Sequence, residues 1–189
     1  MVPTVSIIIP AHNEEKNLTR LIPSLKDQSY PRQKIEYIFI DDSSDDGTSR
    51  VVKGFADKLI RINSRSRVNN SIEYNKGLGL RKATGDLVFW MDADMKVLSR
   101  ACIQLLVKPL TEDQNITGSY ANFHLSVRDG EGNSLLRFIS ENPLQQDPLY
   151  SFLSPSIDST VVEKKDDYWL CKYTLERIPP AGMVMYRRK

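Results

Sequence analysis

Two patterns of apolar residues alternate along the first half of the chain. Continuous apolar runs of strand length lie near residues 5–9, 36–41, 58–62 and 87–91. Between them, apolar residues recur every three or four positions, as on one face of a helix, in 16–28 and 48–58, and a less regular helical segment covers 71–84. Strands that are apolar on both faces and alternate with amphipathic helices are typical of parallel sheets with right-handed crossovers. We therefore predict an α/β fold in which helices cover both faces of a mainly parallel sheet.

Length, charge and the lack of long apolar segments narrow the setting. The 189 residues fit one domain, 1–189, and a formal net charge of +2 is too small to favour nucleic-acid binding. The start lacks the basic and apolar regions of a signal peptide, and no stretch reaches the roughly 18 apolar residues of a membrane span. We expect a cytoplasmic protein with no nucleic-acid partner. Association with the cytoplasmic face of the membrane stays open, because residues 134–155 are rich in Leu, Phe and Tyr.

Polar and acidic residues stand where the predicted strands end. The first strand leads into Pro10, His12, Asn13 and Glu14, the second ends at Asp41 and Asp42, and the fourth ends at Asp92 and Asp94. Ligands of such sheets bind beyond the carboxyl ends of the strands, so we expect these side chains to converge there. Carboxylates held close together repel one another unless a cation or strong donors neutralise them. Oxygen ligands without a cysteine cluster favour Mg²⁺ or Mn²⁺, and the pattern therefore predicts a divalent-metal site at this edge.

Three segments in a fixed order resemble one known family. They are VSIIIPAHNEEKNL, IFIDDSSDDGT and KGLGLRKATGDLVFWMDADM, and as a set they closely resemble the nucleotide-sugar half of the family 2 glycosyltransferases. The resemblance covers about residues 3–98 and resumes at PPAGMVMYRR. It implies a GT-A fold, with 1–98 as the nucleotide-sugar-binding half and 99–189 as the acceptor-side half. It also implies transfer of a sugar, with inversion, from a UDP- or GDP-sugar to an acceptor hydroxyl, with a glycan and a lipid-linked acceptor both open.

The resemblance implies roles for the residues that follow the first two strands. The loop that lines the nucleotide pocket in the family matches Pro10, His12, Asn13 and Glu14. His12 would be placed to stack on the base. Asp42 matches the carboxylate that contacts the base, with Asp41 beside it.

The resemblance also implies how the metal and the diphosphate are held. Asp92 and Asp94 match the two acidic positions of the DXD motif, in which the second is the more direct ligand of Mn²⁺ or Mg²⁺. Basic residues between the second and fourth strands often contact the diphosphate in the family, and the candidates here are Arg67, Lys76 and Arg81.

The residue that would act as general base is not evident. In the family it is an Asp or Glu downstream of a strand resembling YRR, and here the sequence stops at Lys189, directly after GMVMYRRK. Two explanations stay open. Either the 189 residues are a piece of a longer protein, or a carboxylate nearby serves as the base, with Asp158, Asp166 and Asp167 as candidates.

Two other functions compete with metal-dependent sugar transfer. A domain that binds a nucleotide sugar without catalysis is favoured by the missing base. A phosphatase that uses Asp92 and Asp94 as nucleophile and acid is a further alternative, but Lys96 stands where such an enzyme would have Thr or Val.

Overall fold

The computed structural model describes residues 1–62, 72–120, 126–128, 134–137, 161–164, 169–171 and 184–188. The chain divides into two compact units, Met1–Tyr120 with Pro180–Lys189, and Ala121–Pro179. The second unit contributes two antiparallel strand pairs, Ser126–Arg128 (β6) with Ser134–Arg137 (β7) and Val161–Lys164 (β8) with Trp169–Cys171 (β9). Within these described stretches, every helix is too short or too polar to cross a membrane.

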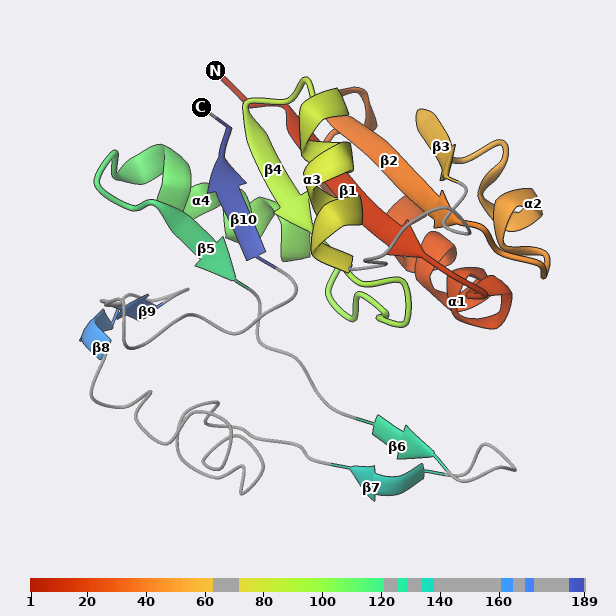
Figure 1. The fold of residues 1–189 in the computed structure, drawn as a ribbon. Helices are drawn as coiled ribbons and strands as arrows, with labels where there is room; N and C mark the ends of the chain where they lie inside the picture. Colours follow the sequence, from red (N-terminus) through yellow and green to blue (C-terminus); the bar gives the residue numbers. More distant parts are fainter. Residues whose placement is uncertain are drawn as a thin grey trace. The chain divides into compact units, whose positions relative to one another are not determined.

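The first unit is built on a six-stranded sheet (Figure 1). The strand order is β3-β2-β1-β4-β10-β5, and the strands are Val5–Ala11 (β1), Ile35–Asp42 (β2), Lys58–Ile62 (β3), Leu87–Trp90 (β4), Gly118–Tyr120 (β5) and Val184–Arg187 (β10). The first four strands run parallel, and β10 lies antiparallel between β4 and β5. All four predicted strands are confirmed, and the β-branched side chains of Ile7, Ile8 and Ile9 are fully buried in the central strand.

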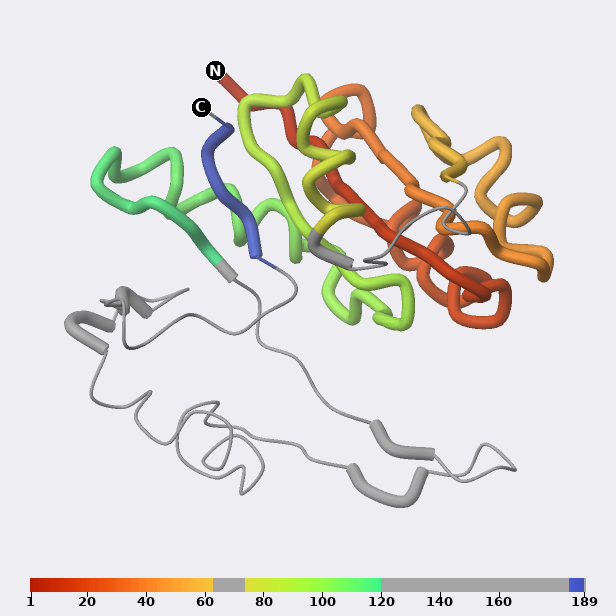
Figure 2. Tube along the Cα trace, viewed as in Figure 1, coloured from red at the N-terminus to blue at the C-terminus, as the bar shows by residue number. Residues whose placement is uncertain are grey.

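Helices cover both faces of this sheet, as predicted. Glu15–Lys26 (α1), Ile72–Lys82 (α3) and Cys102–Glu112 (α4) are the three longer ones, and Arg32–Lys34 forms a short 3₁₀ turn before β2. Figure 1 shows α3 on one face, in front of β1 and β4, with α1 and α4 behind the sheet; the same chain path can be followed in Figure 2. The first unit therefore has an α/β fold, in which helices flank a mainly parallel sheet.

The second predicted helix is shorter than expected. A helix was predicted over 48–58, whereas α2 covers only Thr48–Val52. Gly54 adopts a φ of +98°, in the left-handed region that commonly follows a helix end. The next residue, Phe55, then packs its ring on Tyr37 and Phe39 of β2, with centroids 4.4 and 6.2 Å apart. Packing of this half-buried aromatic side chain on β2 takes the place of the last turns of the expected helix.

Close packing of α3 on the sheet explains one glycine of the GLG segment. A Cβ on Gly79 would lie 2.3 Å from Cγ2 of Ile8 and 3.0 Å from Cδ1 of Ile40. Only a residue without a side chain allows the helix backbone this close to β1 and β2. Gly79 therefore sets the height of α3 above the strands, and α3 carries residues of the candidate site.

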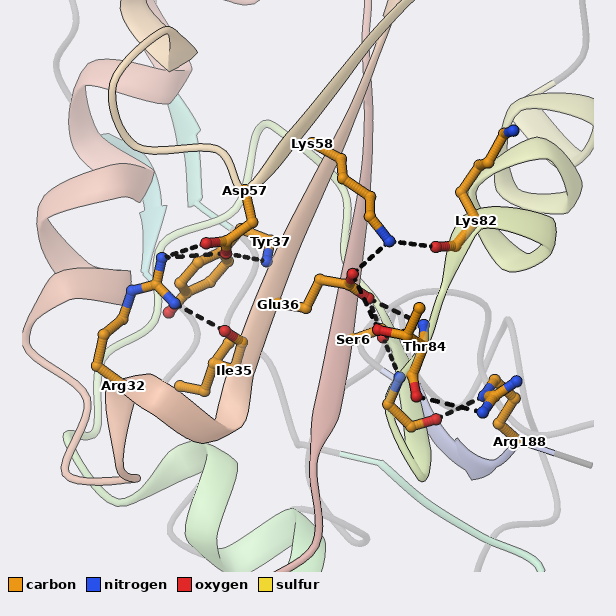
Figure 3. Close-up of polar contacts among 11 residues, drawn as sticks. Ser6, Arg32, Ile35, Glu36, Tyr37, Asp57, Lys58, Lys82, Thr84 and Arg188 are labelled. Atoms are coloured by element: carbon orange, nitrogen blue, oxygen red, sulfur yellow. Dashed lines mark hydrogen bonds and ion pairs between the residues drawn. The ribbon is translucent and has the colours of Figure 1, made fainter.

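The amino ends of the strands are fixed by a polar network (Figure 3). The carboxylate of Glu36 accepts hydrogen bonds from Ser6 Oγ at 2.6 Å and from the backbone N–H of Thr84 at 3.0 Å, and pairs with Lys58 Nζ at 2.5 Å. After β10, Arg188 donates to the carbonyls of Gly85 and Thr84 at 2.6 and 3.2 Å. This network connects the amino ends of β1, β2 and β3 to the segment after α3.

Some predicted features lie outside the described residues or stay untested. Arg67 and the candidate bases Asp158, Asp166 and Asp167 are not among the described positions. The predicted division into halves at residue 98 stays a prediction. The sheet itself continues past that point, since β5 and β10 extend it beyond β4.

Candidate functional site

The carboxyl ends of β1, β2 and β4 meet at one edge of the sheet. In the parallel register Ala11 lies opposite Asp41, and the N–H of Met91 donates to the carbonyl of Ile8 at 3.1 Å, just past the last pair of β4 with β1. The prediction that the acidic segments of β2 and β4 leave the sheet at the same edge is therefore confirmed. That Asp42 and Asp94 line one cleft stays a prediction.

Pro10 belongs to a strand rather than to the loop. It is buried within β1, opposite Ile40. Its missing N–H is tolerated because β4 pairs with β1 only as far as Ile8. The polar loop therefore starts later, at His12.

The loops after β1 and β2 are linked by hydrogen bonds. The backbone N–H of Asn13 donates to Ser44 Oγ at 3.0 Å, and the side-chain oxygen of Asn13 accepts from the N–H of Asp45 at 3.0 Å. The N–H of Glu14 donates to Thr48 Oγ1 at 2.7 Å. These bonds join residues that are 31 to 34 positions apart in the chain. They hold the loop after β1 and the loop after β2 together as one platform.

Two unusual backbone conformations lie in this platform. Asn13 and Ser43 have φ angles of 57° and 58°, in the left-handed region that costs a non-glycine residue free energy. His12, which is exposed, stands beside them with Nδ1 2.6 Å from the carbonyl oxygen of Asp42. Because a carbonyl can only accept, Nδ1 carries the proton and Nε2 is left as an acceptor when the ring is neutral.

Asp41 has a structural role in the turn after β2. Its side chain is 1% exposed, and its carboxylate accepts bonds from the N–H of Ser44 and from the hydroxyl of Ser49, and pairs with Arg61 Nε at 3.1 Å. Burial raises the pKa of Asp41, but these hydrogen bonds and the Arg61 charge outweigh burial and hold the pKa below its usual value. These contacts favour a role in holding the turn, and contact of Asp41 with a nucleotide stays a prediction.

Asp42 presents one free carboxylate oxygen. Asn75, a buried residue of α3, donates from Nδ2 to Oδ2 of Asp42 at 2.9 Å. The other oxygen, Oδ1, is buried and has no hydrogen-bond partner in the described part of the chain. A buried acceptor without a partner costs free energy, and a catalytic role or a bound water or ion is among the explanations for such an atom.

Asp92 forms an ion pair with Lys76, the residue of α3 that follows Asn75. Lys76 Nζ lies 3.4 Å from Oδ1 of Asp92, with the two side chains 13% and 28% exposed. This contact is an ion pair and not a hydrogen bond, since Oδ1 of Asp92 lacks a hydrogen-bond partner within the described stretches. Adjacent residues of α3 thus hold the carboxylates of β2 and β4. Contact of Lys76 with the diphosphate stays a prediction, and its partner in this structure is Asp92.

The remaining predicted charges lie at the surface. Asp94 is exposed and shows no side-chain hydrogen bond or ion pair to another described residue. Arg81 is exposed on the last turn of α3, and its guanidinium reaches back to within 3.9 Å of the point where a Cβ of Gly77 would stand.

The acidic residues suit a divalent ion only if a ligand completes its coordination. No group of three or more His, Cys, Asp or Glu side chains that could hold a metal occurs in the described stretches. Mg²⁺ and Mn²⁺ sites in phosphate-binding enzymes, however, need only one or two protein carboxylates, because phosphate oxygens and water supply the rest. The exposed Asp94 and the partly free Asp92 fit that arrangement.

Comparison with known proteins identifies the family. Residues 6–161 match the sequence profile of Glycosyl transferase family 2. The chain belongs to this family. The match extends well past residue 98, into a part of this family 2 chain where the sequence alone offered no motif. It also leaves the phosphatase alternative without support.

Curated relatives of this family 2 chain are glycosyltransferases. The chain is 30% identical over 113 residues to the 4,4'-diaponeurosporenoate glycosyltransferase of Staphylococcus haemolyticus, which covers 59% of the chain and 29% of the relative. It is 32% identical over 108 residues to the GalNAc(5)-diNAcBac-PP-undecaprenol beta-1,3-glucosyltransferase of Campylobacter jejuni, which covers 56% of the chain and 34% of the relative. The matched part is thus about a third of these relatives' length.

Solved structures of glycosyltransferases confirm the predicted GT-A fold. The mannosyltransferase PcManGT from Pyrobaculum calidifontis, in complex with GDP-Man and Mn²⁺, aligns with a TM-score of 0.54 and 28% identity, covering 62% of this chain and 35% of that one. Residues 1–349 of TarS from S. aureus, in complex with UDP-GlcNAc, align with a TM-score of 0.52 and 24% identity and so support the fold alone.

Sequence reasoning missed the side chains that support the site. Asn75 was not predicted, although it binds Asp42 and directly precedes the predicted Lys76. Ser44 was not predicted as a site residue either, although its hydroxyl oxygen accepts a hydrogen bond from the N–H of Asn13. The sequence did offer a signal for Asn75. It is a polar residue on the apolar face of a predicted helix, and it stands directly before the predicted ligand Lys76.

Proposed function

We propose that this chain binds a nucleoside-diphosphate sugar at the carboxyl edge of the sheet and transfers the sugar, with inversion, to an acceptor hydroxyl. The observation that carries the proposal is the pair of partly free carboxylates, Asp42 and Asp92, each contacted by one of two consecutive residues of α3, with the exposed Asp94 two residues further along the chain.

Each residue has a distinct task in this proposal. Asp42 accepts an N–H of the base through its free oxygen, and His12 stands beside it where it can stack. Asp94 would hold Mn²⁺ or Mg²⁺, with Asp92 contributing, and such an ion supplies Lewis-acid neutralisation of the leaving diphosphate. Lys76 balances the charge of Asp92 and lies where it can also attract a diphosphate oxygen.

Relatives give independent support for the class of donor. One solved relative is named as a complex with GDP-Man and Mn²⁺, and the curated relatives are named for transfer of sugars. The acceptor is proposed to be a glycan or a lipid-linked molecule. Because the matched part is about a third of the curated relatives' length, the general base is proposed to be either a carboxylate among Asp158, Asp166 and Asp167 or one supplied by a longer chain.

Calorimetry with UDP and GDP, each with and without Mn²⁺, tests the proposal on the folded 189-residue chain. We expect heat with at least one nucleotide and tighter binding when Mn²⁺ is present. No heat under all four conditions would contradict the proposal. Binding without release of sugar from UDP- or GDP-sugars would leave the non-catalytic binding domain as the better description of this chain.

A further inference from the structure

A surface groove lies between α1 and the segment 96–100 that precedes α4. The groove has a volume of about 600 Å³ and is lined by the exposed side of α1 and by this segment. Two hydrogen bonds hold the segment against α1. The N–H of Val97 donates to Ser24 Oγ at 3.1 Å, and Gln28 Nε2 donates to the carbonyl of Ser99 at 3.0 Å. These bonds fix the backbone on either side of the residue between them.

That residue, Leu98, extends an apolar side chain into solvent from this fixed backbone. Leu98 is 71% exposed, compared with 42% for Leu105 of α4 and 40% for Leu80 of α3. An exposed leucine alone needs no explanation. Leu98, however, stands between two basic residues of the same segment, Lys96 and Arg100. A partner that suits this segment is therefore both apolar and anionic.

The charge of the groove around Leu98 is positive. Arg20, Lys96 and Arg100 line the groove together with a single acidic residue, Asp27. Arg20 and Lys96 form no ion pair with any other described residue. Arg100 Nε lies 3.2 Å from Oδ1 of Asp27, but the two side chains are 75% and 61% exposed, so water screens this pair. The groove thus offers positive charge that the described part of the chain does not neutralise.

We propose that this groove docks on a bilayer surface that contains anionic phospholipids, with Leu98 inserted below the headgroups and the basic side chains beside the phosphates. Apolar side chains gain free energy at the acyl boundary, and basic residues are attracted to an anionic surface. A single leucine offers too little area for a stable protein interface, whereas a fluid lipid surface adapts to an isolated side chain. Because Asp94 lies two residues before Lys96, such docking favours a lipid-linked acceptor over a soluble glycan.

Co-sedimentation of the 189-residue chain with lipid vesicles tests the proposal. Vesicles of phosphatidylcholine alone are compared with vesicles in which about a third of the lipid is phosphatidylglycerol. We expect partition onto the anionic vesicles to be at least about tenfold stronger. Most of this difference should disappear at about 1 M salt, where the Debye length is only about 3 Å. A difference below tenfold at low salt would overturn the proposal.

The variants Leu98→Ser and Lys96→Gln assign the binding to this groove. Loss of the inserted leucine or of one charge should weaken partition onto anionic vesicles at least about fivefold in each case. Leu80→Ser and Lys82→Gln are the matched controls and should bind as the wild type does. Both residues are exposed on α3, which covers the opposite face of the sheet from α1 (Figure 1).

The possible failures can be told apart. If folded wild-type protein binds UDP or GDP but not anionic vesicles, the docking proposal fails and the proposed function stands. If the wild type binds anionic vesicles and either groove variant binds equally well, the membrane contact lies elsewhere and the proposal for this groove is wrong. If Leu98→Ser does not fold, as judged by circular dichroism, the exposed Lys96→Gln decides alone.

Discussion

Substitution of Gly79 by alanine should destabilise the protein, although alanine is the better helix former. The added Cβ would lie 2.3 Å from Cγ2 of Ile8 and 3.0 Å from Cδ1 of Ile40, and both isoleucines are 0% exposed. Neither neighbour can move into solvent, so α3 must rise from the sheet or the core must shift. Forcing an extra methyl group into a packed core costs ~1–3 kcal/mol, and the 2.3 Å approach places this site at the upper end of that range.

The gain in helix propensity offsets part of this cost. Replacing a mid-helix glycine with alanine stabilises by about 1 kcal/mol. The net expectation is a loss of about 1–2 kcal/mol in the free energy of unfolding, or a fall in Tm of about 2–8 °C for a chain of this length.

Gly77→Ala is the matched control in the same helix. The nearest heavy atom to its added Cβ would be Arg81 Nη1 at 3.9 Å, an ordinary contact with a flexible side chain. Only the propensity gain applies, so this variant should be more stable than the wild type by about 0.5–1 kcal/mol. Urea denaturation of the two variants and the wild type measures both effects. Equal stabilities of Gly79→Ala and Gly77→Ala would refute the close packing of α3 on β1.

Two further predictions concern stability away from the site. Arg187→Ala should lower the free energy of unfolding by about 1–3 kcal/mol, because the Arg187 guanidinium donates to the carbonyls of Leu110 and Asp113 at the end of α4, and an unchanged urea midpoint would contradict this. Burial raises the pKa of Glu36, but hydrogen bonds from Lys58 and other partners outweigh burial and leave the folded pKa below 4.5. The stability that the Glu36 carboxylate contributes is therefore complete above pH 4.5 and is lost as pH falls through the lower folded pKa. Wild type should lose more stability than Glu36→Gln between pH 5 and 3, and parallel pH profiles would show that the network contributes nothing.

The strands and the longer helices could be predicted from the sequence because the patterns that encode them are local. Apolar runs such as that of β1 identify buried strands without knowledge of their neighbours, and parallel topology then places Asp42 and Asp92 at one edge. The end of α2 was missed because it coincides with a contact between residues far apart in the chain, the packing of the Phe55 ring on Tyr37 of β2.

The support of the site depends on contacts that no local pattern contains. Asn75 and Asp42 are 33 residues apart, and their hydrogen bond follows from the height and rotation of α3 over the sheet. That height depends in turn on Gly79. The structural role of Asp41 was likewise invisible, since in sequence it looks equivalent to Asp42, and only the alternation of side chains along β2 directs one inward and the other toward α3.

The most direct test of the central claim is the effect of Mn²⁺ on UDP binding in wild type and in Asp94→Asn. The exposed Asp94 makes no hydrogen bond or ion pair with the rest of the described chain, so the variant should fold normally and change only the metal ligand. Asp45→Asn is the control, since Asp45 is equally exposed in the acidic loop after β2 and uses only its backbone N–H there. We predict that Mn²⁺ tightens UDP binding at least about tenfold, or ~1.4 kcal/mol, in the wild type and the control, and that Asp94→Asn loses most of this gain while its metal-free affinity is unchanged. A full Mn²⁺ effect in Asp94→Asn would contradict a metal site at this edge of the sheet.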